Sequence, residues 1–414
     1  MTEQHPDTSP DALAVDFLAG LGAAMVAANY PSTLIRRALA RSSEHYALSN
    51  QVLLLPNFIQ FGGPNNVAGT TVRVVRAESD LRYDQAFPLA ALVGDVENGR
   101  ITARDGLAKL DHIYALPPRF PAWVGVIGYA VQSCAFALIL QPTPVAMLAA
   151  TGLGLMVGLL GLLGRVSSAV GQLLPTVSSF LVAFTAFSLE RLWHFGDDSL
   201  RDLLAPLALF LPAGAITLAV VDLTTREVVS GSARLVAGFM RLAQLAIGIL
   251  IAAQILGVSA AELNALQLNK FGVWAPWVGV ALYAFGILLY LGPPNRFLPW
   301  LLVTLLVTYA GQVTTNALFG SYASGFGGGL ALMLCAAAIS QRPQAPSAAL
   351  LLPGFWLLVP GALGLVGVTQ LVNANTNSAV AVTVVSMVSI AFGLQAGLLL
   401  WRGGRHLLGY STTG

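Results

Sequence analysis

Residues 121–140 read PAWVGVIGYAVQSCAFALIL, twenty residues without one charged side chain. The apolar core of a bilayer is about 30 Å thick, so an α-helix needs about 20 apolar residues to cross it. The pattern returns at residues 275–291, APWVGVALYAFGILLYL, where WVGV and the following Tyr-Ala repeat at an offset of 154 residues. The two stretches predict membrane-spanning helices and an internal duplication.

The composition of the whole chain agrees with these stretches. Of its 414 residues, 56% are hydrophobic and 10% are charged, whereas charged residues make up about a quarter of an ordinary soluble domain. The charges are also segregated, because 22 of the 40 lie in the first 120 residues. We infer a soluble head followed by a membrane body. The net charge of +2 offers no basic stripe for nucleic-acid phosphates, so no nucleic-acid partner is predicted.

Ten segments of the membrane body are long and apolar enough to cross a bilayer. They lie near 121–140, 144–164, 175–193, 203–222, 236–256, 273–291, 297–313, 317–339, 349–371 and 379–401. With the head inside, the cytoplasmic loops and tail carry most of the arginines, in agreement with the positive-inside rule. An even number of spans places both termini in the cytoplasm. We therefore predict a multi-pass protein of the plasma (inner) membrane.

The fourth and ninth spans are both interrupted by proline and glycine at corresponding positions. Proline inside a helix removes a backbone hydrogen bond, and paired interrupted spans are the best sequence indication of a transporter's central site. Five spans per copy is an odd number, so the second copy enters the membrane from the opposite side. Half-helix N-termini at the breaks would bind a substrate carboxylate. The substrate-binding candidates are Pro212, Gly214, Pro360, Gly361, Thr315 and Asn316.

Ionisable residues are scarce in the spans, where they normally mark ion pathways. Glu190 lies near the outer end of the third span, Asp222 near the inner end of the fourth, and Arg241 in the first turns of the fifth. We predict gating or ion-pair roles for these residues, with Asp222 paired to Arg226 or Arg241. The same positions are also compatible with ordinary anchoring at the membrane interface.

The head reads as a small α+β domain. Apolar residues at spacings of three and four predict an amphipathic helix over 11–28, and Ser32 is a candidate cap for a second helix. Residues 51–61 and 70–76 predict a β-hairpin. A further helix is predicted at about 84–97, ending at Asn98-Gly99, and Thr102 with Asp105 three residues later predicts the capped start of the last one.

Five regions follow from these predictions. They are a disordered tail over 1–11, the cytoplasmic α+β domain over 12–118, transmembrane half 1 with helices 1–5 over 119–256, transmembrane half 2 with helices 6–10 over 273–402, and a cytoplasmic tail over 403–414. The fold class is a polytopic α-helical membrane protein with about ten transmembrane helices in two inverted five-helix repeats, behind a small N-terminal α+β cytoplasmic domain.

No motif of enzyme chemistry stands out. Glu44 and His45 adjoin on one predicted helix, as do Asp111 and His112 on another, but neighbouring residues on a helix point in different directions. HExxH, GxSxG and P-loop motifs do not occur in the sequence. We predict no catalytic residue, cofactor or metal site, and a hydrolase-like site in the head is kept as an alternative.

The layout resembles the threonine/serine exporter family over about residues 12–402. The resemblance is most specific in three places, which are residues 92–111 at the end of the head, residues 209–223 around Leu211-Pro212, and Leu358-Val359-Pro360-Gly361. The family has a cytoplasmic α+β head before ten spans in two five-span halves. Where it often has Pro-Gly, the first half here has Pro212-Ala213-Gly214.

The resemblance implies export of threonine, serine and related small amino acids from the cytoplasm, driven by the proton gradient. The residues themselves predict a secondary transporter that works by alternating access in the lipid bilayer. Three alternatives stay open: a membrane-tethered hydrolase-like enzyme with catalysis in the head, an exporter of another small solute, and a channel. The sequence is also compatible with an oligomer.

Overall fold

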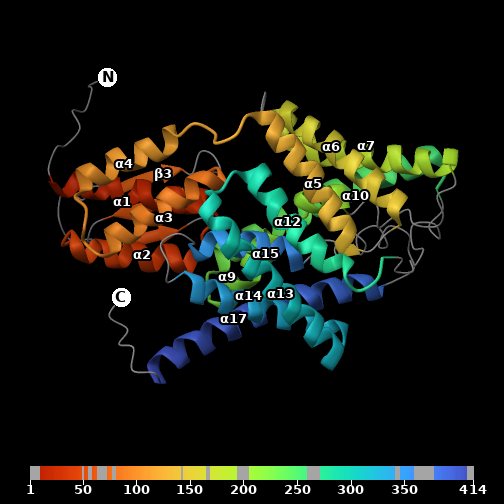
Figure 1. The fold of residues 1–414 in the computed structure, drawn as a ribbon. Helices are drawn as coiled ribbons and strands as arrows, with labels where there is room; N and C mark the ends of the chain where they lie inside the picture. The colour runs from red at the N-terminus through yellow and green to blue at the C-terminus, as the bar shows by residue number, and fades with distance from the viewer. Residues whose placement is uncertain are drawn as a thin grey trace.

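The structure is a computed structural model that describes residues 10–48, 51–54, 58–62, 72–76, 81–140, 143–164, 168–193, 205–258, 271–340, 346–358 and 377–407. Figure 1 shows two bodies, a head of helices with a small sheet at the N-terminal end and a larger body built from helices.

The described residues of the head form helices and a three-stranded sheet. In chain order the elements are α1 (Pro10–Ala27), α2 (Ser32–His45), β1 (Gln51–Leu54), β2 (Phe58–Gly62), β3 (Val72–Arg76), η1 (Tyr83–Gln85), α3 (Ala86–Glu97) and α4 (Ala103–Ala115). Two helices, a run of strands and two further helices thus follow one another in the predicted order.

Helix α1 is the central element of the head. The predicted stripe is present, because Phe17, Leu18 and Leu21 are fully buried. However, Ala19 and Ala24, which point in other directions, are fully buried too. A helix that is buried on all sides lies inside a domain, whereas an amphipathic helix lies at its surface. The predicted helix is therefore present, but its burial is not confined to one face as in an amphipathic helix, because the sheet, α2, α3 and α4 all contact it.

The predicted hairpin is a three-stranded antiparallel sheet in the order β1-β2-β3. The predicted strand over 51–61 divides into β1 and β2, which pair with Leu54 opposite Ile59. Strand β2 then pairs with β3, with Phe61 opposite Arg73. Proline has no amide hydrogen for a strand ladder, and the sequence has Pro56 between the two strands. Residues 55–57 themselves lie outside the described residues.

The local end signals of the last two head helices are confirmed. Gly99 follows α3 with a φ of 63°, a left-handed conformation that glycine adopts without steric cost. The Thr102 hydroxyl oxygen accepts a hydrogen bond of 3.2 Å from the Asp105 amide at the start of α4. Both signals act within one helical turn, so the sequence is sufficient to place them.

The larger body contains the apolar helices. Its described elements are α5 (Ala122–Leu140), α6 (Pro144–Leu163), α7 (Ser168–Trp193), η2 (Ala208–Phe210), α9 (Ala213–Thr224), α10 (Val228–Leu256), α12 (Ala275–Leu291), η3 (Asn295–Phe297), α13 (Leu298–Phe319), α14 (Ser321–Ile339), α15 (Ser347–Leu358) and α17 (Asn377–Leu407).

Each of the ten segments predicted to span the membrane contains an apolar helix. Five helices in the described ranges are long and apolar enough to cross a bilayer by length and composition, and shorter apolar helices occupy the other five segments. The chain is therefore a helical, multi-pass membrane protein. The number of ten spans stays a prediction.

Several predicted boundaries differ from the structure. Helix α7 begins at Ser168, seven residues before the predicted start of the third span. Helix α10 begins at Val228, eight residues before the predicted start of the fifth span, because its first two turns pack against the head (see below). The seventh and eighth segments are divided at Gly320, whose φ is 84°. Helix α13 therefore continues to Phe319, beyond the predicted end at residue 313.

Helices α5 and α12, which carry the repeated WVGV pattern, cross each other in opposite directions. A Cβ atom on Gly128 would lie 2.5 Å from the Tyr290 amide nitrogen, and one on Gly286 would lie 2.6 Å from the Gln132 side chain. The Gln132 side-chain amide donates a 3.3 Å hydrogen bond to the Gly286 carbonyl oxygen. Glycine lets the two backbones approach closely.

Aromatic rings repeat across this crossing. The rings of Tyr129 and Tyr290 are 5.4 Å apart, and those of Tyr283 and Phe136 are 4.9 Å apart. Adding the repeat offset to Tyr129 gives Tyr283, and adding it to Phe136 gives Tyr290. Each contact is thus the counterpart of the other. The remaining helices pack in a similar way, with α7 along α10 and α14 along α17.

Candidate functional site

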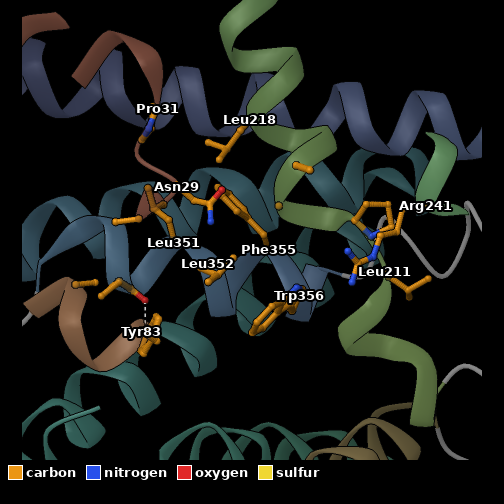
Figure 2. A pocket seen from close by; sticks show the side chains of 16 residues that line it. Asn29, Pro31, Tyr83, Leu211, Leu218, Arg241, Leu351, Leu352, Phe355 and Trp356 are labelled. Carbon is orange, nitrogen blue, oxygen red and sulfur yellow. Dashed lines mark hydrogen bonds between the residues drawn. The ribbon is translucent and has the colours of Figure 1, made fainter. Parts of the chain in front are cut away.

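A cavity of about 260 Å³ lies where the head meets the broken fourth segment. Its walls come from the α1–α2 turn, η1 and α3 of the head, and from α9, α10 and α15 of the body. In Figure 2 the head residues Asn29, Pro31 and Tyr83 lie at the left of the cavity, and Leu211 and Arg241 at the right. The lining residues are Ala28, Asn29, Pro31, Tyr83, Ala86, Leu211, Pro212, Gly214, Ala215, Leu218, Arg241, Ala349, Leu351, Leu352, Phe355 and Trp356.

The predicted break at Pro212 is present and forms one wall. The residue before a proline is pushed out of the helical region, and Leu211 has the extended angles φ −63° and ψ 129°. Helix η2 therefore ends at Phe210, and α9 starts at Ala213 without a side-chain cap. The first amides of a helix have no intrahelical acceptor. At the start of α9 these amides belong to Ala213, Gly214 and Ala215, and the last two residues line the cavity.

Gly214 keeps α15 close to α9. A Cβ atom at this position would lie 3.3 Å from a methyl carbon of Leu352, tighter than an ordinary van der Waals contact. A larger side chain would push the two helices apart. Pro212 and Gly214 both line this cavity, and their role in substrate binding stays a prediction. The partners predicted to face them, Pro360 and Gly361, lie outside the described residues.

Arg241 is the one charged residue among the described residues that line the cavity. It lies thirteen residues after the start of α10, which is about 20 Å along the helix. The prediction that placed it in the first turns was wrong, because α10 starts earlier than predicted. Its guanidinium carbon lies 5.8 Å from the centre of the Phe210 ring. Arg241 is an exposed residue beside the break in the fourth segment.

Tyr83 connects the head to α15. Pro353 lies inside α15 and has no amide hydrogen, so the Ala349 carbonyl four residues earlier has no donor within the helix. The Tyr83 hydroxyl donates a hydrogen bond to that carbonyl. Tyr83 is buried, and burial raises the pKa of its hydroxyl well above the ordinary value, so the hydroxyl stays protonated as a donor. Its ring packs against Phe87 and Phe297.

The proline-bearing segments also receive hydrogen bonds from the crossing helices. The Tyr129 hydroxyl of α5 donates to the Pro206 carbonyl oxygen at 2.9 Å. The Tyr283 hydroxyl of α12 donates to the Pro353 carbonyl oxygen at 3.2 Å. Two tyrosines at matching places in the WVGV pattern thus donate to proline carbonyls, one just before the break at Pro212 and one inside α15.

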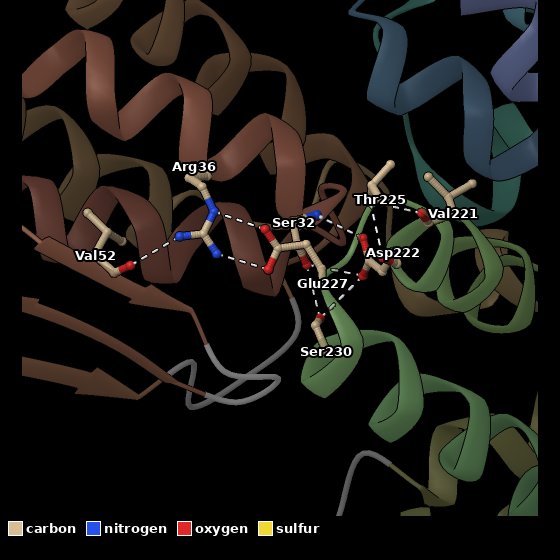
Figure 3. Close-up of polar contacts among 8 residues, drawn as sticks. All are labelled: Ser32, Arg36, Val52, Val221, Asp222, Thr225, Glu227 and Ser230. Carbon is tan, nitrogen blue, oxygen red and sulfur yellow. Dashed lines mark hydrogen bonds and ion pairs between the residues drawn. The ribbon is translucent and has the colours of Figure 1, made fainter.

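Asp222 is completely buried where the end of α9 meets the head. Figure 3 shows its carboxylate at the N-terminus of α2. It accepts hydrogen bonds from the Ser32 amide at 3.4 Å, the Ser32 hydroxyl at 3.1 Å and the Ser230 hydroxyl at 3.2 Å. The Arg234 Nε atom lies 3.6 Å from the carboxylate. We call Asp222, Ser32, Ser230 and Arg234 the Asp222 cluster.

Two predictions are corrected by the Asp222 cluster. The N-cap residue of α2 is Pro31, which has no side-chain hydrogen bond to the helix, and an acceptor from α9 satisfies the Ser32 amide instead. A negative group at a helix N-terminus is favourable. The ion-pair partner of Asp222 is Arg234, rather than the predicted Arg226 or Arg241. Arg226 is exposed in the turn between α9 and α10, with a φ of 68°.

A second set of contacts reinforces this junction. Arg36 of α2 makes two hydrogen bonds of 2.9 Å to the Glu227 carboxylate, as Figure 3 shows, and a third of 3.3 Å to the Val52 carbonyl oxygen. Arg234 also donates to the Tyr30 carbonyl oxygen at 3.2 Å. The head is thus joined to the α9–α10 turn by paired charges at the surface and in the interior.

The other predicted site residues lie elsewhere. Thr315 and Asn316 are in the last turns of α13 and do not line the cavity. The Thr315 hydroxyl donates to the Gly311 carbonyl oxygen at 2.7 Å, and Asn316 is exposed. Glu190 lies near the end of α7, and its side chain is outside the described residues.

The alternative of an enzyme site in the head gains no support. The His45 Nε2 atom lies 2.7 Å from the Glu97 carbonyl oxygen at the end of α3, which accounts for this residue as a structural contact. Within the described ranges, no group of three or more His, Cys, Asp or Glu side chains could hold a metal ion.

Four residues at the site were not predicted to be functional. The cavity is lined by Asn29 and Tyr83, and the Asp222 cluster includes Ser32 and Arg234. The sequence does contain a signal for the acceptor of the Tyr83 hydrogen bond. Pro353 lies inside an apolar helix and leaves the Ala349 carbonyl without a donor from that helix. The sequence does not say which residue supplies that donor, because Tyr83 and Ala349 are 266 residues apart.

A family model described as "Putative threonine/serine exporter" matches residues 16–256. The matched part starts in α1, covers the remainder of the head and ends with the last residue of α10. It includes Pro212, Gly214, the Asp222 cluster and Arg241. Neither the curated proteins nor the solved structures contain a match to this chain.

Proposed function

Because the chain belongs to the threonine/serine exporter family, we propose that it is a secondary transporter that exports threonine, serine or a related small amino acid from the cytoplasm across the plasma membrane. The observation that carries the proposal is the cavity at the broken fourth segment, which combines a helix start, one arginine and apolar walls. Its volume of about 260 Å³ is below the roughly 300–1,000 Å³ of drug-sized pockets, which suits a small solute.

The chemistry of the cavity walls fits an amino acid. The first amides of α9 and the Arg241 guanidinium offer hydrogen-bond donors and positive charge to a carboxylate. Leu352, Phe355 and Trp356 form the apolar wall opposite. A carboxylate group bound by these donors would leave the rest of the solute in contact with the α15 wall and the head.

The contacts at the α5–α12 crossing support two inverted halves and alternating access. The repeated helices run in opposite directions, and their ring pairs and tyrosine hydrogen bonds occur in matching sets. Repeats of opposite orientation around a midplane site are the usual basis of alternating access. We propose that the two halves move against each other at this crossing and that the proton gradient drives export, the latter on the family resemblance alone.

The contacts of the head support cytoplasmic termini and an even number of spans. The head meets the α9–α10 turn, the segment at Phe297 and the start of α15. Arg119, which follows the head, donates to Asn295 at 2.8 Å. The predicted topology places all of these positions on the cytoplasmic side.

The direct test is transport by the full chain in proteoliposomes loaded with labelled threonine or serine. We expect efflux that an imposed proton gradient accelerates and that Arg241→Gln slows, with a KM raised about tenfold by loss of a charged hydrogen bond. Arg104→Gln, an exposed arginine of α4, is the matched control. Pro212→Ala and Pro360→Ala, made separately, should lose transport while still inserting.

Folded wild-type protein that moves neither threonine or serine nor any other small amino acid of a tested panel would overturn the proposal. Efflux that is equal in the two arginine variants would remove the carboxylate site at Arg241. Hydrolysis of a substrate by the full chain without transport would favour the enzyme alternative. Efflux of a different small solute from a tested panel would keep the transporter and change its substrate.

A further inference from the structure

The head supplies part of the cavity wall. The α1–α2 turn contributes Ala28, Asn29 and Pro31, and η1 and α3 contribute Tyr83 and Ala86. The cavity is therefore bordered by the soluble domain on one side and by the broken fourth segment, α10 and α15 on the other, as Figure 2 shows. A domain that served only as an anchor or a partner surface would not need to line the cavity.

Asn29 is held in an unusual backbone conformation at the end of α1. Its φ is 57°, in the left-handed region that asparagine tolerates better than most residues. Its side chain is exposed, lines the cavity and hydrogen-bonds no other group in the described part of the chain. A carboxamide carries both donors and an acceptor, so it can bind a hydroxyl group in either direction.

The contacts described above keep this wall in place. Ser32 of the Asp222 cluster directly follows Pro31, and the Tyr30 carbonyl oxygen accepts a hydrogen bond from Arg234. Arg234 and Arg241 are seven residues apart on α10, which is about two helical turns, so they lie on the same face of that helix. The turn that carries Asn29 and the helix that carries Arg241 are thus fastened to each other.

Tyr83 fixes the other wall. Its hydroxyl donates to the carbonyl that Pro353 leaves without a donor in α15, the helix that carries Leu352 and Phe355. The head therefore contacts α15 beside the cavity, at the point where the α15 backbone lacks an internal hydrogen bond.

We propose that the head is part of the solute site: Asn29 binds the side-chain hydroxyl of the solute, and Tyr83 is a positioning residue that holds α15 against the cavity. The inference rests on the proposed function, because it takes the solute in this cavity to be a hydroxylated amino acid. The carboxylate lies toward α9 and Arg241, and the hydroxyl lies toward the head.

The test uses the full chain in proteoliposomes with labelled threonine and with labelled 2-aminobutyrate, which lacks the hydroxyl group. A site that hydrogen-bonds a hydroxyl group rejects the analogue without it. Asn29→Ala should raise the KM for threonine about tenfold and leave the KM for 2-aminobutyrate unchanged. An equal effect on both solutes, or none on either, would overturn the role of Asn29.

The positioning role of Tyr83 is tested by removing a tyrosine hydroxyl group at two different positions of the head. Tyr83→Phe should lower the maximal rate several-fold. Tyr46→Phe should leave it unchanged, because the Tyr46 hydroxyl donates to the Ile101 carbonyl oxygen within the head. Ala86→Phe should fill the cavity and raise the KM for both solutes at least tenfold, whereas Ala91→Phe, on an exposed position of the same helix, should not.

The outcomes separate this inference from the proposed function. Wild-type transport of threonine together with head variants that behave like their controls would refute the inference and leave the transporter intact. No threonine transport by folded wild-type protein would refute both. Each variant is compared with its control at equal amounts of monodisperse protein. If one variant fails to fold, the remaining variants and their controls still test the inference.

Discussion

The substitution Asp222→Asn removes the negative charge of the Asp222 cluster and keeps the volume of the side chain. Arg234, whose side chain is 16% exposed, then loses its counter-ion. Breaking a buried pair by removing one partner costs about 3–5 kcal/mol. Arg234 retains some exposure and its hydrogen bond to the Tyr30 carbonyl, so the lower end of the range, about 3 kcal/mol, is the expected cost.

Hydrogen exchange of the full chain in detergent measures this cost where it acts. Asp222 is the acceptor of the Ser32 amide. In Asp222→Asn, this amide and those of the following turn of α2 should exchange about 100-fold faster. The factor follows because each 1.36 kcal/mol of lost stability corresponds to a factor of about ten. Amides in the middle of α1 should change much less. The control is Asp95→Asn, which removes an exposed pair with Lys109 worth at most about 1 kcal/mol.

A double variant sharpens the measurement. Arg234→Met removes the charge that Asp222→Asn leaves buried, and replacing both partners of a buried pair is often neutral or stabilising. The double variant should therefore exchange more slowly at the start of α2 than Asp222→Asn alone. Unchanged exchange in Asp222→Asn, or an effect no larger than that of Asp95→Asn, would refute the conclusion that this cluster fastens the head to α9 and α10.

Three further predictions concern single contacts. Gly286→Ala would place a Cβ atom 2.6 Å from the Gln132 side chain, so it should lower the free energy of unfolding by about 1–3 kcal/mol in a thermal melt. Gly152→Ala, which has no atom within 4 Å of the new Cβ, should be neutral or slightly stabilising. Equal melting temperatures of the two variants would contradict this. Pro353→Ala restores an amide that can bond to the Ala349 carbonyl, so transport should no longer respond to Tyr83→Phe in that background; an undiminished response would show that the hydroxyl acts elsewhere. Thr102→Ala removes the N-cap of α4 and should cost about 1 kcal/mol, seen as faster exchange of the first α4 amides; unaltered exchange would exclude a capping role.

Local signals in the sequence located many elements correctly. The apolar segments contain helices because twenty apolar residues in a row favour burial and internal hydrogen bonding. Thr102 caps α4 and Gly99 follows α3, since each acts within one turn of its own position. Pro212 breaks the fourth segment for the same kind of reason, because its missing amide and its effect on Leu211 are properties of adjacent residues.

The errors arose where contacts between distant residues decide the outcome. Ser32 has the chemistry of an N-cap, but its hydroxyl binds Asp222, which lies 190 residues away. Arg226 is nearer to Asp222 in sequence than Arg234, yet its left-handed backbone lies in an exposed turn, and α10 returns Arg234 to the carboxylate. Helix α1 has the spacing of a surface helix, and only the surrounding sheet and helices bury its other faces.

The sequence by itself determined the apolar helices, the repeated WVGV pattern and the break at Pro212, because periodicity, proline and helix caps act over a few residues. Only the tertiary structure decided that the head lines the cavity, that Tyr83 serves the carbonyl freed by Pro353, and that Arg234 neutralises Asp222. These contacts join residues that are far apart in the chain, and no short-range pattern encodes which donor meets which acceptor. The packing of the head against α9, α10 and α15 selects those pairs.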